Sequence, residues 1–519
     1  RLPGAFAMYD LEAAALASAV GAFLYTALAG FGVPAQRSLV MLAVALAVLM
    51  ARRDVGAANG LAFAALAVLI RDPFAPTSAS FWLSFGAVAL LLLIATRREV
   101  GPARGARGAR FRHGSLLAVS LQVAMSFGSV PFVALYFSRV SLVSPLANLL
   151  AVPYFNIALE PATLAGVLGV AAGIPGAVEL LHVAGRLTDW AWAGIHIAAS
   201  LPWASVGVAP PASWSLGLAL AGVAAAMPAH PLPGRLWAWC ALLPLLLARA
   251  PRPPPGAAEV TMLDVGHGLA VIVETRTHRL LYDAGPRSPS GYDSGREIVV
   301  PALSLEPRAG LDRLIVSHAD ADHSGGAASV LAAFPGADVL KGPDVTQLPG
   351  RTCAQGQHWQ WDGVEFEMLY PPPGSAPLGN DSSCVLKITT IAGSVLLDGD
   401  IEARAEQRLI EWGGLAADVV AVPHHGSPTS STARFVQHTG ARYALVSAGF
   451  PSRWNFPRPE VVARWQAEGA DVWVTGRSGA LTVTLDGRGI RVTGERLRRK
   501  RYWRTFSKPS PGMPQQRGL

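Results

Sequence analysis

The residues of this chain that are best suited to chemistry lie in the short segment Ser317–Gly326. His318, Asp320, Asp322 and His323 occupy positions i, i+2, i+4 and i+5, after an apolar run and before two glycines. Imidazole nitrogens and carboxylate oxygens bind divalent metals, and a strand that ends in such a loop points several of them at one spot. We therefore predict a metal site that uses all four side chains. The alternative is a solvated polar loop.

Three further candidate ligands follow strand-like apolar runs later in the chain. They are Asp400, His424 and His425. Together with the first segment they could hold two ions, about 3.5–4 Å apart, with Asp400 as the bridging carboxylate. At least one of the two histidines is expected to be a ligand, and the other can orient its neighbours by hydrogen bonding. For Asp400 the alternative is a turn carboxylate after Gly399.

The chemistry predicted for this site is metal-assisted hydrolysis of a phosphodiester. Two ions can activate a water molecule for attack on phosphorus and stabilise the leaving oxygen. We assign His318, Asp322 and Asp400 to catalysis, with Asp322 orienting the nucleophile. The ligand set has as many carboxylates as imidazoles and no thiolate, so Mn and Mg are favoured more than at a typical zinc site. We predict two divalent ions, Mn or Zn, with Mg as a further option.

Other polar residues near these motifs are candidates for supporting roles. Asp264 and Asp283 could assist the metal site or only form turns, because aspartate near glycine is common in turns. Asn380 and Ser383 could orient a phosphate or a water molecule, and a structural turn explains them equally well. His267, between two glycines, is predicted to be a tight-turn residue rather than a catalyst.

A β-rich domain must position these residues. Several strand-like runs end in an acid or an imidazole, which predicts one rim built from separated segments. The runs are Val260–Asp264, Ala270–Glu274, Leu280–Gly285, Val395–Asp400 and Val419–Pro423.

The first half of the chain is composed of apolar segments near the length of a membrane span, which is about 20 residues. Segment 141–172 contains Pro145, Pro153 and Pro161, so it is a candidate pore element if broken, or else a long helix with an interfacial piece. Loops rich in arginine at 52–53 and 97–112 predict a cytoplasmic face, and nine spans then leave the C-terminal domain outside. The segments lie at about 11–33, 38–51, 56–70, 79–96, 114–137, 141–172, 177–200, 213–228 and 235–249.

Composition divides the chain into a membrane domain at 1–252, a Pro-rich linker at 253–258, an α/β domain at 259–495 and a basic, disordered tail at 496–519. The net charge of +8 comes from the first and last regions, which each carry +8, whereas 259–495 carries −8. The α/β domain is therefore not a basic nucleic-acid binder by overall charge. Residue 1 is arginine, so we expect the sequence to begin inside a longer protein.

The chain contains three cysteines. Cys240 lies in the last apolar segment and is expected to be packed there. Cys353 and Cys384 could form a disulfide if their domain faces an oxidising compartment. Two unpaired buried thiols are the alternative, because the sequence does not give their separation.

The motifs together resemble the ComEC family of DNA-uptake channels. The segment around His318 is similar to the His-x-His-x-Asp-His signature of the metallo-β-lactamase superfamily, with Asp320 in place of the second histidine. The other matching motifs are Leu263–Gly268, Tyr282–Gly285, Asn380–Leu386, Leu397–Glu402, Pro423–Ser427, Leu28–Arg37, Phe81–Gly86 and Ser141–Asn148. The resemblance covers roughly residues 10–495. This chain departs from the family at His267, where glutamine is common, and at Phe456-Pro457, where the family has His-Pro.

The resemblance implies a polytopic α-helical membrane domain followed by an α/β metallo-β-lactamase-like domain, which is an αββα sandwich. It implies an inner-membrane channel that takes up single-stranded DNA in natural transformation, with an extracytoplasmic nuclease domain that degrades the other strand. An amino-terminal OB-like domain and further membrane segments of the family are missing from this sequence. The expected partners are single- and double-stranded DNA, the lipid bilayer, a DNA receptor outside, and an ATPase or single-strand-binding proteins inside, since the chain has no P-loop.

Two other functions remain open at this point. One is a DNA channel whose metal-binding domain does not cleave, which the aspartate at position 320 and the absent final histidine favour. The other is a membrane-anchored metallohydrolase of small phosphate substrates, against which the many apolar segments argue, because an anchor needs only one helix.

Overall fold

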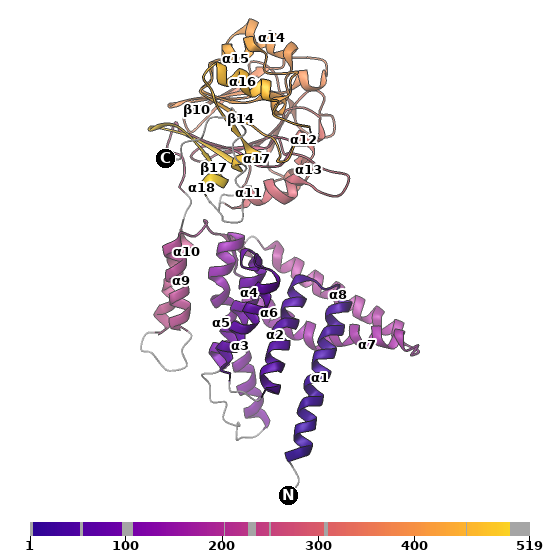
Figure 1. Cartoon of the computed structure of the whole chain (residues 1–519). Helices are drawn as coiled ribbons and strands as arrows, with labels where there is room; N and C mark the ends of the chain where they lie inside the picture. Colours follow the sequence, from indigo (N-terminus) through magenta and orange to yellow (C-terminus); the bar gives the residue numbers. More distant parts are fainter. Residues whose placement is uncertain are drawn as a thin grey trace. The chain divides into compact units, whose positions relative to one another are not determined.

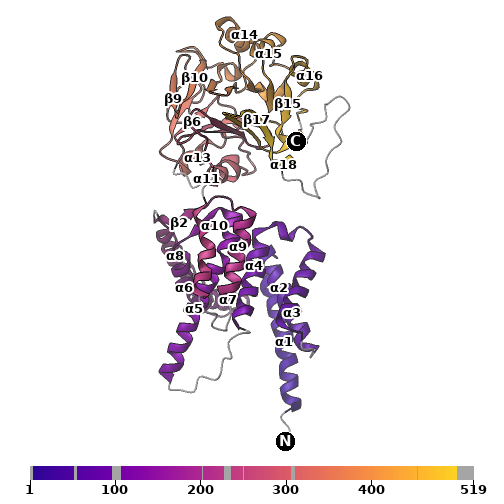
Figure 2. The same cartoon turned by 90° about the vertical axis from the view of Figure 1, so that its left-hand side faces the viewer.

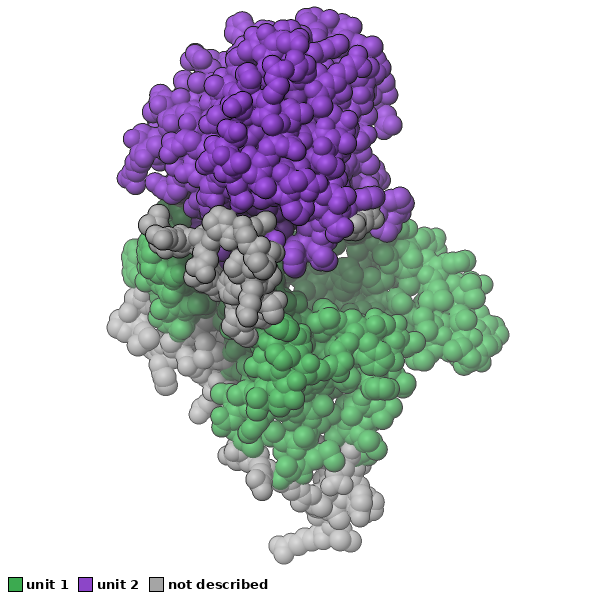
Figure 3. All heavy atoms as spheres, turned by 45° about the horizontal axis from the view of Figure 1, so that its top comes forward, with its two compact units in different colours: residues 1–250, 305–307 green, residues 251–304, 308–519 purple. Residues whose placement is uncertain are grey.

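The computed structural model describes residues 4–51, 55–95, 107–201, 203–226, 235–248, 251–305, 310–452 and 454–498. The chain forms two compact units. Unit 1 contains Arg1–Ala250 and Leu305–Pro307, and unit 2 contains Pro251–Ser304 and Arg308–Leu519 (Figure 3). The predicted Pro-rich linker at 253–258 thus belongs to unit 2, where the Gly256 N–H donates to the Asp362 carbonyl at 2.7 Å.

The described residues of unit 1 are helical apart from loops and two short strands that pair antiparallel although they lie far apart in the sequence (Figure 1). Its elements coincide with the nine predicted apolar segments. They are α1 (Gly4–Leu28), α2 (Val33–Met50), α3 (Ala57–Arg71), η1 (Ala75–Thr77), α4 (Ala79–Ala95), α5 (Arg107–Phe137), β1 (Arg139–Ser141), α6 (Ser144–Tyr154), η2 (Phe155–Leu159), α7 (Glu160–Ala171), α8 (Ala177–Ser200), β2 (Ser205–Gly207), α9 (Ser213–Ala226), η3 (Arg235–Leu242) and α10 (Leu243–Leu247).

Much of the apolar surface of unit 1 is not covered by the chain itself. Ile70, Ile157 and Trp237 are each more than three-quarters exposed. In the described part of the chain, Val33–Met50 and Ser144–Ala171 are long and apolar enough to cross a membrane, and six further apolar helices are shorter. The predicted nine spans and their orientation stay predictions. Arginines 52, 53, 97, 98 and 104, on which the orientation rested, lie outside the described residues.

The prolines in 141–172 do not break the helix. Helical backbone runs from Ser144 to Ala171, with a π-helical turn, η2, between α6 and α7. Pro145 stands in the first turn of α6, where proline's missing N–H costs little. The π-helical turn lies between Pro153 and Pro161, whose missing N–H groups interrupt the hydrogen-bond pattern of an α-helix. The expectation of a broken segment was therefore wrong, and the alternative of a long helix holds for this stretch.

Unit 2 is built on two mixed sheets. The first has the strand order β17-β16-β3-β4-β5-β6-β7-β8 and the second the order β15-β14-β13-β12-β11-β10-β9. The strands are β3 (Ala258–Met262), β4 (Val271–Glu274), β5 (Arg279–Tyr282), β6 (Arg313–Val316), β7 (Asp338–Lys341), β8 (Arg351–Thr352), β9 (His358–Trp361), β10 (Val364–Tyr370), β11 (Val385–Thr390), β12 (Gly393–Leu397), β13 (Val419–Ala421), β14 (Tyr443–Val446), β15 (Asp471–Val474), β16 (Leu481–Asp486) and β17 (Gly489–Gly494).

Helices cover both outer faces of this sandwich (Figures 1 and 2). One apolar core joins the two sheets, a second lies between the second sheet and α14–α16, and a third lies between the first sheet and α11–α13. Four layers in the order αββα follow from these three cores, as predicted. The helical elements are η4 (Gly295–Val299), α11 (Val300–Ser304), α12 (Ala321–Ser324), α13 (Ala327–Ala333), η5 (Gly379–Ser382), α14 (Ala403–Trp412), η6 (Pro423–Gly426), α15 (Ala433–Thr439), α16 (Pro459–Ala467), α17 (Thr475–Ser478) and α18 (Glu495–Arg498).

Parallel strands bring the predicted ligand loops together. β5 pairs with β6 in parallel, and β12, β13 and β14 pair in parallel in the other sheet. Because the carboxyl ends of parallel strands meet at one edge of a sheet, the loops after these five strands converge on two facing edges. Cys353 and Cys384 form a disulfide that joins the β8 end of one sheet to the β11 start of the other.

Candidate metal centre

Four side chains form a compact cluster at these edges. Asp322, His323, Asp400 and His425 each offer one ligand atom, and the four atoms lie within 4.8 Å of one another. The Nε2 atom of His323 lies 3.0 Å from Oδ1 of Asp400, and Nε2 of His425 lies 3.2 Å from Oδ2 of Asp322. Two carboxylates and two imidazole nitrogens at this spacing suit a divalent cation.

His323 is held in place by a buried carboxylate. Its Nδ1 lies 2.7 Å from Oδ2 of Asp283, and both side chains are fully buried. Asp283 also accepts hydrogen bonds from the backbone N–H and the hydroxyl of Ser317, at 2.6 and 2.7 Å. A carboxylate that accepts from one imidazole nitrogen fixes the ring and leaves the other nitrogen free to bind metal. Asp283, predicted as a supporting residue, thus orients His323 towards the cluster.

His425 is oriented by the backbone of the next strand. Its Nδ1 lies 2.9 Å from the Ser447 carbonyl, which can only accept, so Nδ1 carries a proton and Nε2 is the nitrogen that faces the cluster. His424 and His425 both have left-handed backbone angles, with φ of 51° and 55°. Two such residues in succession, neither of them glycine, are costly and concentrate at functional sites. This turn directs His425 inward.

The charges of the cluster favour a cation. Burial alone would raise the pKa of Asp400, but His323 and His425 hold it well below its ordinary value. Burial alone would lower the pKa of His323, but the carboxylates of Asp400 and Asp283 raise it well above the ordinary value of a histidine. Burial alone would also raise the pKa of Asp322, but the hydrogen bond from His425 and the charges of His323 and His425 together lower it. The carboxylates are therefore ionised and attract positive charge to their midpoint.

The other predicted ligands surround this cluster. His318 is fully buried, its ring centroid is 4.3 Å from that of His323, and its Nε2 has no hydrogen-bond partner in the described part of the chain. Asp320 is 60% exposed, with Oδ2 at 3.7 Å from that Nε2. Nε2 of His424 lies 3.9 Å from Oδ2 of Asp400. The unpartnered nitrogen of His318 fits a further metal bond, and ligation by these three stays a prediction.

The remaining supporting candidates have different surroundings. Ser383 accepts a hydrogen bond from the Asp400 backbone N–H at 3.2 Å, and its hydroxyl lies 3.3 Å from Nδ1 of His318. Asn380 contributes its carbonyl, which accepts from Ser383. Asp264 lies outside the cluster and pairs with Arg496 at 2.5 Å. That pair also fixes the first residue of the predicted basic tail, of which residues 499–519 lie outside the description.

For two residues near the metal centre, the sequence prediction did not include the contacts that the structure shows. His267 does sit in a turn between glycines with positive φ, yet its ring is 4.6 Å from that of His425 and its Nε2 is 3.5 Å from Oδ2 of Asp322. Burial and the neighbouring His425 lower its pKa to about 4, so it is uncharged at neutral pH. Ser317, directly before His318, bridges Asp283 and both loop histidines. Only its place before the ligand loop pointed to it.

Comparison with known proteins now defines the class. The competence protein family model matches residues 4–232, and the metallo-β-lactamase superfamily model matches residues 263–449. Unit 2 is therefore a metallo-β-lactamase-fold domain that carries a candidate divalent metal site. A metallo hydrolase from the archaeon Ignicoccus hospitalis is 17% identical, covers 43% of this chain and 98% of its own, and aligns with a TM-score of 0.33. Zn²⁺-bound PqqB from Methylobacterium extorquens is 13% identical, covers 41% and 86%, and aligns with a TM-score of 0.27.

Curated relatives match this chain across both units. Competence protein ComA of Neisseria gonorrhoeae is 34% identical over 94% of this chain and 67% of its own length. An uncharacterised Escherichia coli protein, YcaI, is 32% identical over 94% of this chain and 64% of its own. ComE operon protein 3 of Bacillus subtilis is 25% identical, covering 88% and 62%. This chain belongs to the ComEC/ComA-like family of competence proteins, which are membrane proteins. It spans about two thirds of the length of these relatives.

Proposed function

We propose that this chain is the membrane and metallohydrolase portion of a DNA-uptake protein. In this proposal unit 1 passes single-stranded DNA across the inner membrane. Unit 2, on the extracytoplasmic side, hydrolyses phosphodiester bonds of the strand that is not transported. The observation that carries the proposal is the cluster of Asp322, His323, Asp400 and His425 at the converging strand ends of unit 2, in a chain of the competence family.

The residues of the cluster divide the work of hydrolysis. A bound divalent ion, or a pair of them, would supply charge neutralisation and activation of water. Asp283 and the Ser447 carbonyl fix the two imidazole rings, so no reorganisation of the donors is needed during reaction. Asp322 is 27% exposed at the mouth of the cluster, where its carboxylate can orient the attacking water. His318 and Asp400 complete the predicted catalytic set.

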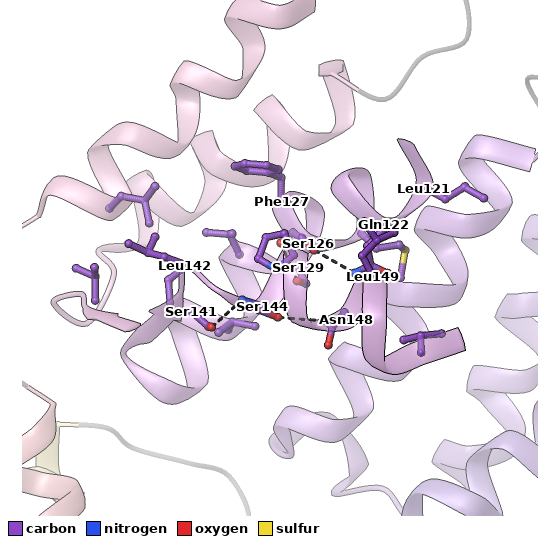
Figure 4. Close-up of a pocket in the computed structure, with 18 of the residues that line it drawn as sticks. Leu121, Gln122, Ser126, Phe127, Ser129, Ser141, Leu142, Ser144, Asn148 and Leu149 are labelled. Atoms are coloured by element: carbon purple, nitrogen blue, oxygen red, sulfur yellow. Dashed lines mark hydrogen bonds between the residues drawn. The ribbon is translucent and has the colours of Figure 1, made fainter. Parts of the chain in front are cut away.

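A cavity in unit 1 supports the passage of a strand. It has a volume of about 840 Å³ and lies between α5, α6, α10 and the paired strands β1 and β2 (Figure 4). Hydroxyl and amide groups line part of it: the Asn148 amide donates to Ser144 at 3.1 Å, and the Gln122 amide donates to Ser126 at 3.3 Å. The described residues that line it include no charged side chain. Neutral groups that form weak bonds let a polar chain move, whereas strong ones would hold it.

The partners and the sidedness belong to the same proposal. A DNA receptor outside would deliver double-stranded DNA to unit 2. An ATPase or single-strand-binding proteins inside would draw in the strand, because the sequence contains no P-loop. The disulfide between Cys353 and Cys384 supports an oxidising compartment for unit 2, since such bonds rarely persist in the cytosol.

A channel with a metal-binding but non-cleaving unit 2 is the second candidate. One observation favours it. The compact cluster contains four ligands, whereas Asp320 is mostly exposed and lies outside it. A single ion without a partner would have no second centre for the leaving oxygen.

The test is cleavage of labelled single- and double-stranded DNA by the full chain in detergent, with Mn²⁺, Mg²⁺, Zn²⁺ or EDTA. We expect cleavage that needs a metal and that falls by more than about 100-fold in His323→Ala, because loss of outer partners alone costs up to that much. His438→Ala, an exposed histidine on α15, is the matched control. A folded chain that binds ions but cleaves neither substrate with any metal would overturn the nuclease and favour the second candidate.

A further inference from the structure

A second cavity in unit 2 borders the metal loops. It has a volume of about 770 Å³ and is formed by the loop after β14, by α16 and by α17. Phe450, Phe456, Arg458 and Arg477 are among its lining residues, and the described part of that lining contains no carboxylate. Aromatic rings and guanidinium groups in one acid-free cavity suit a ligand that is both flat and anionic.

This loop, of which residues 449–452 and 454–459 are described, packs directly against the metal centre. A side chain at Gly426 would collide with Pro457, whose Cβ would be 2.6 Å away, so the loop packs against the residue after His425. The Arg458 backbone N–H donates to the Gly426 carbonyl at 3.0 Å. At the other end, Gly449 packs closely on the backbone of Gly266. The cavity and the ligand loops therefore keep a constant spacing.

Aromatic rings connect the cluster to the cavity. His267, which lies against His425, has the Trp454 ring centroid at 5.9 Å and the Phe456 ring centroid at 6.0 Å. The Arg458 guanidinium lies 5.8 Å from the Phe456 ring. Trp454 is 47% exposed and Phe450 67% exposed, so both rings are accessible to a ligand beside the metal centre.

Arg458 has spare hydrogen-bonding capacity. Its Nε is buried and has no hydrogen-bond partner in the described residues. A guanidinium can bind phosphate with two parallel N–H donors, and the two terminal nitrogens offer such a pair. Arg477, on α17, adds a second, exposed cation to the same cavity.

We propose that this cavity, lined by Phe450, Phe456, Arg458 and Arg477, is a nucleotide subsite for an unpaired stretch of the DNA substrate. A base stacks on the exposed ring of Phe450 or Trp454, and the phosphates beside it bind Arg458 and Arg477. The strand is thereby held so that a neighbouring phosphodiester reaches the metal centre. Stacking needs a base that is not paired, so the subsite selects single-stranded over double-stranded DNA. This inference rests on the proposed function for its substrate class.

The test is binding of a fluorescent twelve-residue oligothymidylate to the full chain in detergent, with EDTA present so that no cleavage is required. We expect Phe450→Ala and Arg458→Gln each to weaken binding about tenfold, the usual order for one stacked base or one phosphate contact. Trp412→Ala on α14 and Arg434→Gln on α15 are matched controls at exposed sites, and both should stay within twofold. A duplex of equal length should bind more weakly and not respond to Phe450→Ala.

The salt dependence separates a phosphate contact from a merely structural role. Each arginine that binds a phosphate of a single strand should reduce the slope of log Kd against log salt by about 0.7 when it is replaced by glutamine. Arg477→Gln, at an exposed position, gives this readout even if Arg458→Gln fails to fold. Unchanged affinity and unchanged slope in Arg477→Gln and Phe450→Ala would overturn the subsite.

The outcomes distinguish this inference from the proposed function. Weaker binding in the variants together with no cleavage under any metal would keep the subsite and remove the nuclease. If the chain cleaves DNA with metal but its affinity for oligothymidylate is unchanged by these substitutions, the nuclease proposal is supported and the subsite is contradicted.

Discussion

The two units place their large apolar side chains in opposite ways. Unit 2 buries its large side chains between layers, so that Tyr282 and Phe366 are at most 1% exposed. Unit 1 leaves Ile70 and Ile157 76% exposed on its helices. The first pattern is that of a domain folded in water, and the second is that of helices whose outer faces contact lipid. The difference shows that one chain is adapted to two solvents.

Two buried arginines show the same contrast for charge. Arg279 in unit 2 is 2% exposed and bonds to Glu274 Oε1 and to the Leu303 carbonyl, each at 2.7 Å. Arg37 in α2 is 3% exposed, and none of its three guanidinium nitrogens has a hydrogen-bond partner within the described residues. The buried Arg279 of unit 2 is thus paired internally, whereas no described residue accepts a hydrogen bond from the buried guanidinium of Arg37 in unit 1.

The largest expected effect comes from exchanging these arginines. Arg279→Met should lower the free energy of unfolding of unit 2 by about 3–5 kcal/mol, because the buried hydrogen bonds to Glu274 and to the Leu303 carbonyl are lost. Arg37→Met should change the stability of unit 1 by less than about 1 kcal/mol, since no internal bond is lost. Thermal unfolding of both variants in detergent measures this. A comparable loss of stability in the two variants would contradict this difference between the units.

The next effect concerns the cysteines. The disulfide between Cys353 and Cys384 closes a loop with a sequence separation of 31, so its removal by paired alanine substitutions should destabilise unit 2 by about 3 kcal/mol. Cys240→Ala in unit 1 is the control and should leave unit 2 unchanged, because that thiol is free and exposed. The melting temperature of unit 2 with and without reductant reports the difference. No response to reductant would contradict the prediction.

Asp283→Asn tests whether chemistry is confined to unit 2. The amide no longer fixes the His323 ring as a carboxylate does, so metal-dependent cleavage should fall by about 10–100-fold. Because Asp283 acts through His323, metal affinity should fall as well, which calorimetric titration with Mn²⁺ measures. Asp293→Asn, at another buried aspartate of unit 2, is the comparison. Equal losses in the two variants would indicate general destabilisation rather than positioning.

The smallest effect should come from a polar contact between the sheets. Asp362, after β9, accepts hydrogen bonds from Thr275 and Thr277 in the β4–β5 turn, at 2.6–2.8 Å. Burial alone would raise the pKa of Asp362, but these bonds hold it well below its ordinary value. Asp362→Asn should therefore cost about 1 kcal/mol at neutral pH.

The pH dependence of that contact has a definite sign. Since the folded pKa is the lower one, the stabilisation is present above the unfolded value of about 4 and is lost as the pH falls through the folded value. Urea unfolding of unit 2 at pH 7 and pH 3 should show a smaller difference between wild type and Asp362→Asn at the lower pH. A difference that grows on acidification would contradict the assignment.

The sequence alone determined the parts that depend on local pattern. Apolar segments gave the helices of unit 1, because helix formation there follows from composition and length. Strand-like runs that end in Asp283, His318, Asp400 and His425 gave the edge of the site, because parallel strands deliver their last residues to one side. The Cys353–Cys384 disulfide was left open, since a distance between sheets is not local information.

Only the tertiary structure decided which of these side chains meet. His424 and His425 are equivalent in sequence, yet the left-handed turn and the Ser447 carbonyl direct His425 into the cluster. Asp264 and Asp283 both precede a glycine by two residues, but one pairs with Arg496 and the other with His323. The physical reason is that the register and stacking of strands far apart in the chain decide which partner a side chain meets. The local sequence pattern predicts only that the side chain lies at the end of a strand.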